Sequence, residues 1–111
     1  MPHTHIIADL HGCQANLHGA MAAEIEIVDI CFRAGATVLA SRFHEFPNGA
    51  YTGVVLLAES HVSIHTWPED SYAAVDAFTC GEQACPSKIV NEVALMLMAR
   101  EVNRTVLKRG E

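Results

Sequence analysis

Ser60, His65 and Cys80 are the side chains of this chain whose types could carry out covalent and proton-transfer chemistry. A serine hydroxyl can act as a nucleophile, an imidazole titrates near neutral pH, and a thiol can donate a proton. A Ser–His pair could also serve a hydrolase, but no Gly-x-Ser-x-Gly motif surrounds any serine. Taken singly, these residues could equally be a turn serine, a half-exposed sheet histidine and a buried thiol.

The segment from residue 59 to residue 69, ESHVSIHTWPE, concentrates these groups. It is expected to end one strand and begin the next, with Ser60 at the tight junction. Because side chains alternate along a strand, one face should carry the polar and aromatic residues His61, Ser63, His65 and Trp67. Val62, Ile64 and Thr66 should occupy the other face. A titratable face opposite an apolar one suits a solvated sheet, and also a site between two sheets.

The surrounding pattern predicts the elements that position this segment. Strands are expected at residues 4–10, 36–46, 53–58, 61–67, 72–80 and 104–108. Helices are expected at residues 18–34 and from Pro86 onward, where proline suits a first helical turn. Gly35 is placed to end the first helix as a left-handed cap. A helical repeat of Met21, Ile25, Val28 and Phe32 gives that helix an apolar stripe, and Ile89, Val93, Met96 and Leu97 do the same for the second helix.

This order predicts an α+β two-layer sandwich, a largely antiparallel sheet with two helices on one face. Two helices cover only one side of a sheet. However, Val54, Val55, Leu56 and Leu57 place apolar side chains on both sides of their strand. The second face therefore needs a cover, and sheets pairing in a homodimer are the simplest solution.

Length and charge restrict the classes of protein. The 111 residues suit a single domain spanning residues 1–111, and the net charge of −6 argues against a nucleic-acid partner. No apolar run approaches the roughly 18 residues of a membrane-spanning helix, and the N-terminus resembles no signal peptide. No membrane association and a cytoplasmic location are the expectations.

Metal binding is not expected. The four cysteines do not form two Cys-x-x-Cys pairs. His3 and His5 are spaced like a metal clip, but no cysteine or acidic partner follows at a useful spacing.

Two long blocks resemble the prokaryotic S-adenosylmethionine decarboxylase proenzyme family. They are Glu59-Ser60-His61 with the following IHTWPE, and YAAVD followed by FTCG up to Gly81. The FHEF segment at residues 43–46 and residues 5–13 match as well, so that the resemblance spans nearly the whole chain.

The resemblance implies self-cleavage between Glu59 and Ser60 into chains 1–59 and 60–111. The Ser60 hydroxyl would attack the Glu59 carbonyl, and elimination would leave a pyruvoyl group derived from Ser60, the cofactor that binds the substrate amine as a Schiff base. His65 would be the processing base and Cys80 the proton donor in turnover. Thr52 would supply the hydroxyl that steadies the first intermediate, at a position where the family usually has serine.

The resemblance also implies a substrate site. Phe46 would stack on the adenine, Trp67 would lie near the pocket, and Glu69 would hold the ribose. Without the resemblance, core packing explains both aromatic residues. In the family the site lies between two copies: Ser60 and Cys80 come from one, while Thr52, Phe46, His65 and Glu69 come from the other.

Some positions depart from the family pattern, and they leave alternatives for the function. The loop 47–51, Asp9 and His11 are unusual, so the same chemistry could act on ornithine or arginine, with Glu45, Glu69 and Asp70 as carboxylates for a basic substrate. A non-catalytic homologue is a third hypothesis, opposed by the presence of Ser60, His65 and Cys80. The main expectation is decarboxylation of S-adenosylmethionine for polyamine synthesis.

Overall fold

The computed structural model describes residues 3–79 and 85–110. In chain order the elements are β1 (His3–His11), α1 (Ala20–Arg33), β2 (Val38–Glu45), β3 (Tyr51–Leu57), β4 (Ser60–Trp67), the short 3-10 helix η1 (Pro68–Asp70), β5 (Tyr72–Thr79), α2 (Pro86–Met96) and β6 (Glu101–Arg109). The strands form one six-stranded sheet in the order β2-β3-β4-β5-β1-β6, and every neighbouring pair is antiparallel.

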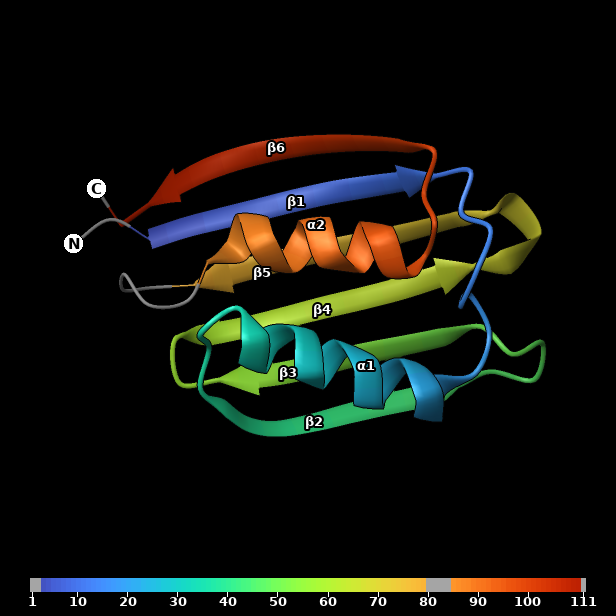
Figure 1. The fold of residues 1–111 in the computed structure, drawn as a ribbon, viewed down its shortest axis with the longest axis horizontal. Helices are drawn as coiled ribbons and strands as arrows, with labels where there is room; N and C mark the ends of the chain where they lie inside the picture. Colours follow the sequence, from blue (N-terminus) through green and yellow to red (C-terminus); the bar gives the residue numbers. More distant parts are fainter. Residues whose placement is uncertain (1–2, 80–84, 111) are drawn as a thin grey trace.

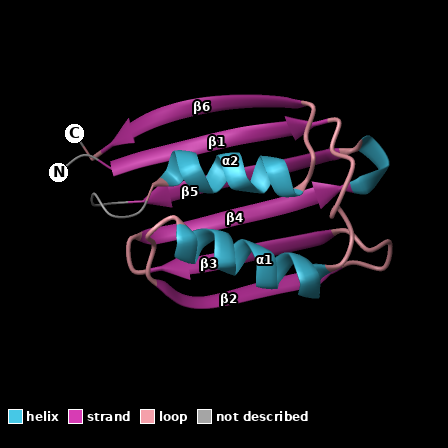
Figure 2. Ribbon diagram, in the orientation of Figure 1, coloured by secondary structure: helices cyan, strands magenta, loops and turns pink. Residues whose placement is uncertain are grey.

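Both helices lie on the same face of the sheet, α1 over β2 and β3 and α2 over β5 and β1 (Figures 1 and 2). This is the predicted two-layer α+β architecture. The last strand, β6, is longer than the predicted 104–108. It is an edge strand, and its side chains are nearly all exposed. An exposed edge strand has no alternation of buried and exposed residues from which its length could be recognised.

The predicted helix at α1 is confirmed, but its apolar stripe is not the face that packs on the sheet. Met21 and Phe32 are 77% and 72% exposed, and Ile25 is exposed as well. The packed face combines Ile27 and Ile30 with the smaller Ala20, Ala23 and Cys31, and Val28 of the predicted stripe is partly buried beside it. The alanines allow the helix to approach the sheet closely at its start, while Met21, Ile25 and Phe32 lie on the outer side of the helix.

Helix α2 packs as predicted. Ile89, Val93, Met96 and Leu97 are all buried, and Pro86 occupies the first turn. The Gly35 cap is also confirmed, since Gly35 has φ of 89°, a left-handed conformation that glycine adopts without steric cost. The core therefore lies between the two helices and the sheet face that they cover.

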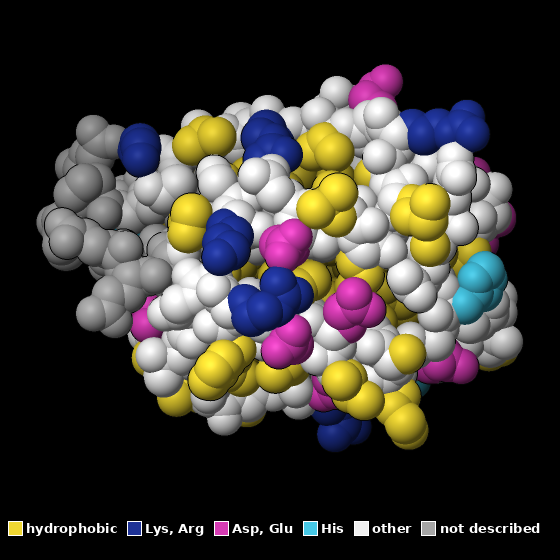
Figure 3. All heavy atoms as spheres, in the orientation of Figure 1, with side chains coloured by type: hydrophobic (Ala, Val, Ile, Leu, Met, Phe, Trp, Pro, Cys, Tyr) yellow, Lys and Arg dark blue, Asp and Glu magenta, His cyan; other side chains and the backbone are white. Residues whose placement is uncertain are grey.

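The other sheet face is uncovered within one chain, as the apolar pattern of β3 predicted. Val55 and Leu57 are buried under the helices, whereas Val54 and Leu56 on the opposite face are 41% and 49% exposed. Figure 3 views the helix side, where hydrophobic side chains lie scattered among charged ones. Among the described helices, none has the length and apolar character needed to cross a membrane. The open sheet face is the surface that carries the candidate site.

Candidate active site on the open sheet face

Strand β4 presents its polar side chains to the open face, as its alternation predicted. Val62, Ile64 and Thr66 are buried against the helices, and the residues between them are only partly buried. On the open face His65 lies directly opposite Thr52 of β3, and the Thr52 hydroxyl is hydrogen-bonded to His65 Nδ1. The structure therefore places together two of the predicted processing residues.

Ser60 occupies a strained position at the start of β4. It pairs with Leu57 across a two-residue turn formed by Ala58 and Glu59. Its φ is 149°, in a region that residues with a Cβ rarely adopt, at a cost on the order of 1–3 kcal/mol. The strain lies at the residue whose preceding peptide bond is the predicted cleavage site.

Glu59 is anchored outside this turn. Its carboxylate accepts a hydrogen bond of 2.9 Å from the Thr37 backbone N–H, and this bond lowers the pKa of Glu59 below its ordinary value. The Glu59 side chain is thus directed toward Thr37, just before β2. Its backbone carbonyl lies in the tight turn before Ser60.

Within one chain, Ser60 and His65 are at opposite ends of β4. They are five positions apart along the strand, a span of about 17 Å at the usual rise per residue. At its own end, Ser60 pairs with Thr79 of β5, the residue before Cys80. Cys80 itself lies outside the described residues, so its predicted role as proton donor remains a prediction.

The predicted substrate residues line one pocket at the His65 end of β4. Phe46, Trp67 and Glu69 surround a cavity of about 260 Å³ together with His65 and Asn48. The His65 and Trp67 ring centres are 4.1 Å apart, and those of Phe46 and His65 are 5.7 Å apart. Glu69 accepts a 3.2 Å hydrogen bond from the Asn48 amide. The loop 47–51 therefore contributes directly to this pocket, through Asn48 and Ala50.

A row of aromatic rings continues from this pocket across the open face. Trp67 stacks on Tyr72 with ring centres 5.1 Å apart, and Tyr72 stacks on His11 at the same separation. The Tyr72 hydroxyl donates a 2.5 Å hydrogen bond to Asp9, which raises the pKa of Tyr72 to about 12. Asp9 and His11 thus have a common partner in Tyr72.

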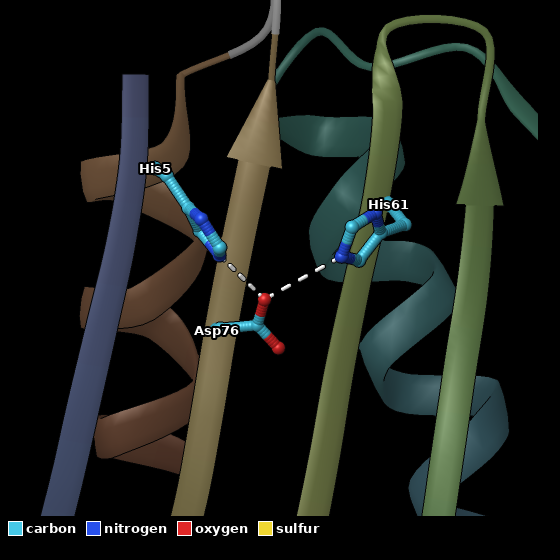
Figure 4. Close-up of side chains that lie close together, drawn as sticks. All are labelled: His5, His61 and Asp76. Atoms are coloured by element: carbon cyan, nitrogen blue, oxygen red, sulfur yellow. Dashed lines mark hydrogen bonds and ion pairs between the residues drawn. The ribbon is translucent and has the colours of Figure 1, made fainter. Parts of the chain in front are cut away.

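A second polar cluster, which the sequence analysis missed, lies in the middle of the same face. Asp76 of β5 accepts a 2.7 Å hydrogen bond from His5 Nε2 of β1, and its carboxylate lies 3.5 Å from His61 Nε2 of β4 (Figure 4). Ser63 donates a hydrogen bond to the other oxygen of Asp76. A lone carboxylate in an otherwise apolar stretch, between Val75 and Ala77, was the available signal for this cluster.

This cluster and the Thr52–His65 pair border the same cavity of about 340 Å³. Its polar lining consists of His5, Thr52, Ser63, His65 and Asp76. One ligand atom from each of His5, His61 and Asp76 lies within 4.8 Å of the others, so the three could also hold a metal ion. The open face is therefore a continuous strip of titratable groups.

A two-layer α+β fold that displays a strained serine, histidines, a carboxylate and aromatic pockets on one face is organised as an enzyme. The family model for S-adenosylmethionine decarboxylase matches residues 4–110. The chain therefore belongs to the S-adenosylmethionine decarboxylase family.

Similar proteins support this assignment. The S-adenosylmethionine decarboxylase proenzyme of Caldicellulosiruptor saccharolyticus is 45% identical over 107 residues, covering 96% of this chain and 86% of that protein. The proenzyme of the archaeon Methanococcus maripaludis is 41% identical over 107 residues, covering 96% of this chain and 88% of its own. The crystal structure of the adenosylmethionine decarboxylase from Aquifex aeolicus superimposes with a TM-score of 0.86 at 34% identity, covering 98% of this chain and 91% of that one.

Proposed function

We propose that this chain is a self-processing decarboxylase that converts S-adenosylmethionine to its decarboxylated form, an aminopropyl donor for polyamine synthesis. Membership of the family carries the proposal. The Thr52–His65 pair and the turn at Ser60 support it, and nothing in the comparisons favours ornithine or arginine as substrate.

Self-cleavage between Glu59 and Ser60 would divide the chain into segments 1–59 and 60–111. Ser60 suits this role because its hydroxyl is attached to a backbone held at a positive φ, in a two-residue turn. Rearrangement of the peptide bond to an ester releases this strain, which lowers the barrier to attack by Ser60 Oγ on the Glu59 carbonyl. The group formed at Ser60 would then be a pyruvoyl group.

His65 and Thr52 would act together on Ser60 of a second copy. The Thr52 hydroxyl, hydrogen-bonded to His65 Nδ1, fixes the orientation of the ring. Held in this way, the imidazole would remove the α-proton of the partner's residue 60, and the Thr52 O–H would donate a hydrogen bond to the oxyanion of the acyl shift.

The proposed homodimer would use the same open face. The exposed Val54 and Leu56 give it an apolar component, and Ser60 and His65 of one chain are too far apart to react. A two-fold pairing of open faces would set the Ser60 end of one β4 against the His65 end of the other.

The cavity beside His65 suits an adenosine-bearing substrate. Phe46 and Trp67 offer aromatic faces for the adenine, and the Glu69 carboxylate can accept hydrogen bonds from ribose hydroxyls. Glu45, a carboxylate considered for a basic amino acid, instead accepts the Ala20 backbone N–H at the start of α1 at 2.9 Å.

In turnover, the pyruvoyl carbonyl would supply the electrophile that takes up the substrate amine and withdraws electrons as carbon dioxide leaves. Cys80 would then return a proton to the α-carbon. A thiol can be tuned to donate near neutral pH, because its ordinary pKa is about 8.5.

Mass spectrometry and a decarboxylation assay test the proposal together. Purified protein should yield two fragments divided at Glu59–Ser60, the second with a blocked N-terminus, and should release carbon dioxide from S-adenosylmethionine but not from ornithine or arginine. Ser60→Ala should remain one inactive chain, and Cys80→Ala should mature but turn over poorly. An intact wild-type chain after long incubation would overturn the proposal.

A further inference from the structure

Ser60 has a histidine within its own chain at hydrogen-bonding distance. Ser60 Oγ lies 3.1 Å from Nδ1 of His61, the next residue. The other nitrogen of the same ring, Nε2, lies 3.5 Å from Oδ2 of Asp76. A hydroxyl, an imidazole and a carboxylate are therefore arranged in series, with the ring between the two oxygens.

The surrounding hydrogen bonds define the direction of proton transfer along this series. The Arg109 guanidinium can only donate, and it lies 3.2 Å from His5 Nδ1, so this nitrogen accepts. The proton of His5 is then on Nε2 and is donated to Asp76 at 2.7 Å. Asp76 thus accepts hydrogen bonds from His5 and Ser63, and its carboxylate also faces His61 Nε2 at 3.5 Å.

An Asp76 carboxylate facing His61 Nε2 favours the tautomer with the proton on that nitrogen. His61 Nδ1 is then unprotonated and can accept the proton of the Ser60 hydroxyl. The Phe78 ring fixes the histidines from the side, stacked on His5 at 4.7 Å and edge-on to His61 at 5.9 Å. The ring positions are thus set by packing as well as by hydrogen bonds.

We propose that His61 is the proton shuttle for the first step of self-cleavage, with Asp76 as its positioning residue. This inference rests on the self-processing function proposed above. Ser60 Oγ bonds to the Glu59 carbonyl carbon while its proton passes to His61 Nδ1. When the carbon–nitrogen bond breaks, the same proton passes to the departing Ser60 nitrogen, which leaves an ester and a free amine.

This role differs from that of His65, which would act on the α-proton at the later elimination step and from the second copy. His61 needs no second copy, because it adjoins Ser60 in sequence. His61 would therefore act on the Ser60 hydroxyl and His65 on the Ser60 α-proton. Removal of one or the other should stop self-cleavage at different stages.

Hydroxylamine distinguishes these stages, because it cleaves the ester but not the ordinary peptide bond at Glu59–Ser60. We would synthesise wild type, His61→Ala, His61→Gln and His65→Ala in a cell-free system and follow precursor loss by mass spectrometry, with and without hydroxylamine. Fragments are assigned by mass, which separates them from cleavage at the hydroxylamine-sensitive Asn48–Gly49 bond. His18→Ala, which removes a histidine from the loop before α1, is the matched control.

We expect His61→Ala to lose precursor about 100-fold more slowly than wild type and to give no hydroxylamine-dependent fragment ending at Glu59. His65→Ala should be equally slow but yield that fragment, and His18→Ala should process normally. Normal processing of His61→Ala, or accumulation of the ester in it, would overturn the inference. His61→Gln, which keeps a polar side chain, decides the question if the alanine variant fails to fold.

Asp76 provides a second test that a purely structural role would not satisfy. Asp76→Asn should slow ester formation on the order of 10-fold, and Asp76→Glu, which restores the carboxylate, should recover most of it. Processing that is lost with a chelator and restored by Zn²⁺ would overturn the relay in favour of a metal held by His5, His61 and Asp76. An uncleaved wild-type chain would instead refute the proposed function, so the two failures are distinguishable.

Discussion

Thr52 and His65 are direct partners across strands β3 and β4, and their side chains are hydrogen-bonded to each other, some 17 Å along β4 from the serine they are proposed to serve. This arrangement makes a complete site within one chain impossible if both residues act on Ser60. It therefore predicts that each site is assembled from two chains.

Co-expression of two inactive variants tests this prediction. Ser60→Ala lacks the cleavable serine and His65→Ala lacks the base, so neither should mature alone. In a mixed dimer, the intact Ser60 of the His65→Ala chain meets the intact His65 of the Ser60→Ala chain. We therefore expect a fraction of the His65→Ala chains to be cleaved, as measured by mass spectrometry of differently tagged chains.

A control for exchange is required. Joining Ser60→Ala with a second Ser60→Ala chain of different tag should give no cleavage, and size-exclusion chromatography with light scattering should show dimers in both cases. Dimers that contain both variants and still show no cleavage would contradict a site shared between chains.

The hydrogen bond of the Thr52 hydroxyl to His65 leads to a separate prediction about the rate of self-cleavage. Thr52→Ala removes one hydrogen bond to His65, which should slow cleavage about 10-fold, the effect of roughly 1.4 kcal/mol. Thr52→Ser keeps the hydroxyl without the methyl group and should process at least as fast as wild type. Time courses of precursor loss measure both, and equal rates for the alanine and serine variants would exclude a role for the hydroxyl.

The alternation of residues along β4 was sufficient to predict which side chains share the open face, because a buried strand position repeats every second residue. The sequence also predicted the uncovered face from Val54 and Leu56. It did not predict the packed face of α1, since Ala20 and Ala23 are weak hydrophobic signals and Met21 and Phe32 are strong ones. Which face of a helix packs depends on how closely its side chains let it approach the sheet, and hydrophobicity alone does not predict that.

The polar cluster of the site was predictable only in part. His61 and Ser63 lie on the recognised segment, but His5 and Asp76 reach it through the pairing of β1 with β5 and of β5 with β4. Strand order joins residues that are 71 positions apart in sequence, as His5 and Asp76 are. The order of the strands in the sheet cannot be deduced from residue spacing or composition.

The buried thiol of Cys31 predicts a dependence of reactivity and stability on pH. Burial raises the pKa of Cys31 to about 12, whereas Cys85 is exposed. Because alkylation requires the thiolate, iodoacetamide at pH 8 should modify Cys85 and leave Cys31 intact in the native protein, as peptide mass spectrometry would show. Modification of both in denaturant is the control.

The same pKa shift has a stability consequence whose sign can be derived. Above about pH 8.5 the unfolded chain loses the Cys31 proton that the native chain retains until about pH 12. The free energy of unfolding should therefore fall as pH rises through this interval. In Cys31→Ala this component of the slope should disappear, and urea unfolding at pH 8 and pH 10 would detect its persistence.

The strain at Ser60 can be measured in chains that cannot cleave. Ser60→Ala and Ser60→Gly both lack the hydroxyl, so both remain precursors, but only alanine keeps the Cβ that disfavours a φ of 149°. Glycine adopts this conformation freely, and the relief should exceed the greater flexibility that it gives to the unfolded chain. We expect Ser60→Gly to be about 1 kcal/mol more stable than Ser60→Ala in urea unfolding. If the alanine variant is the more stable, the backbone before cleavage is relaxed, and strain contributes nothing to the attack on Glu59.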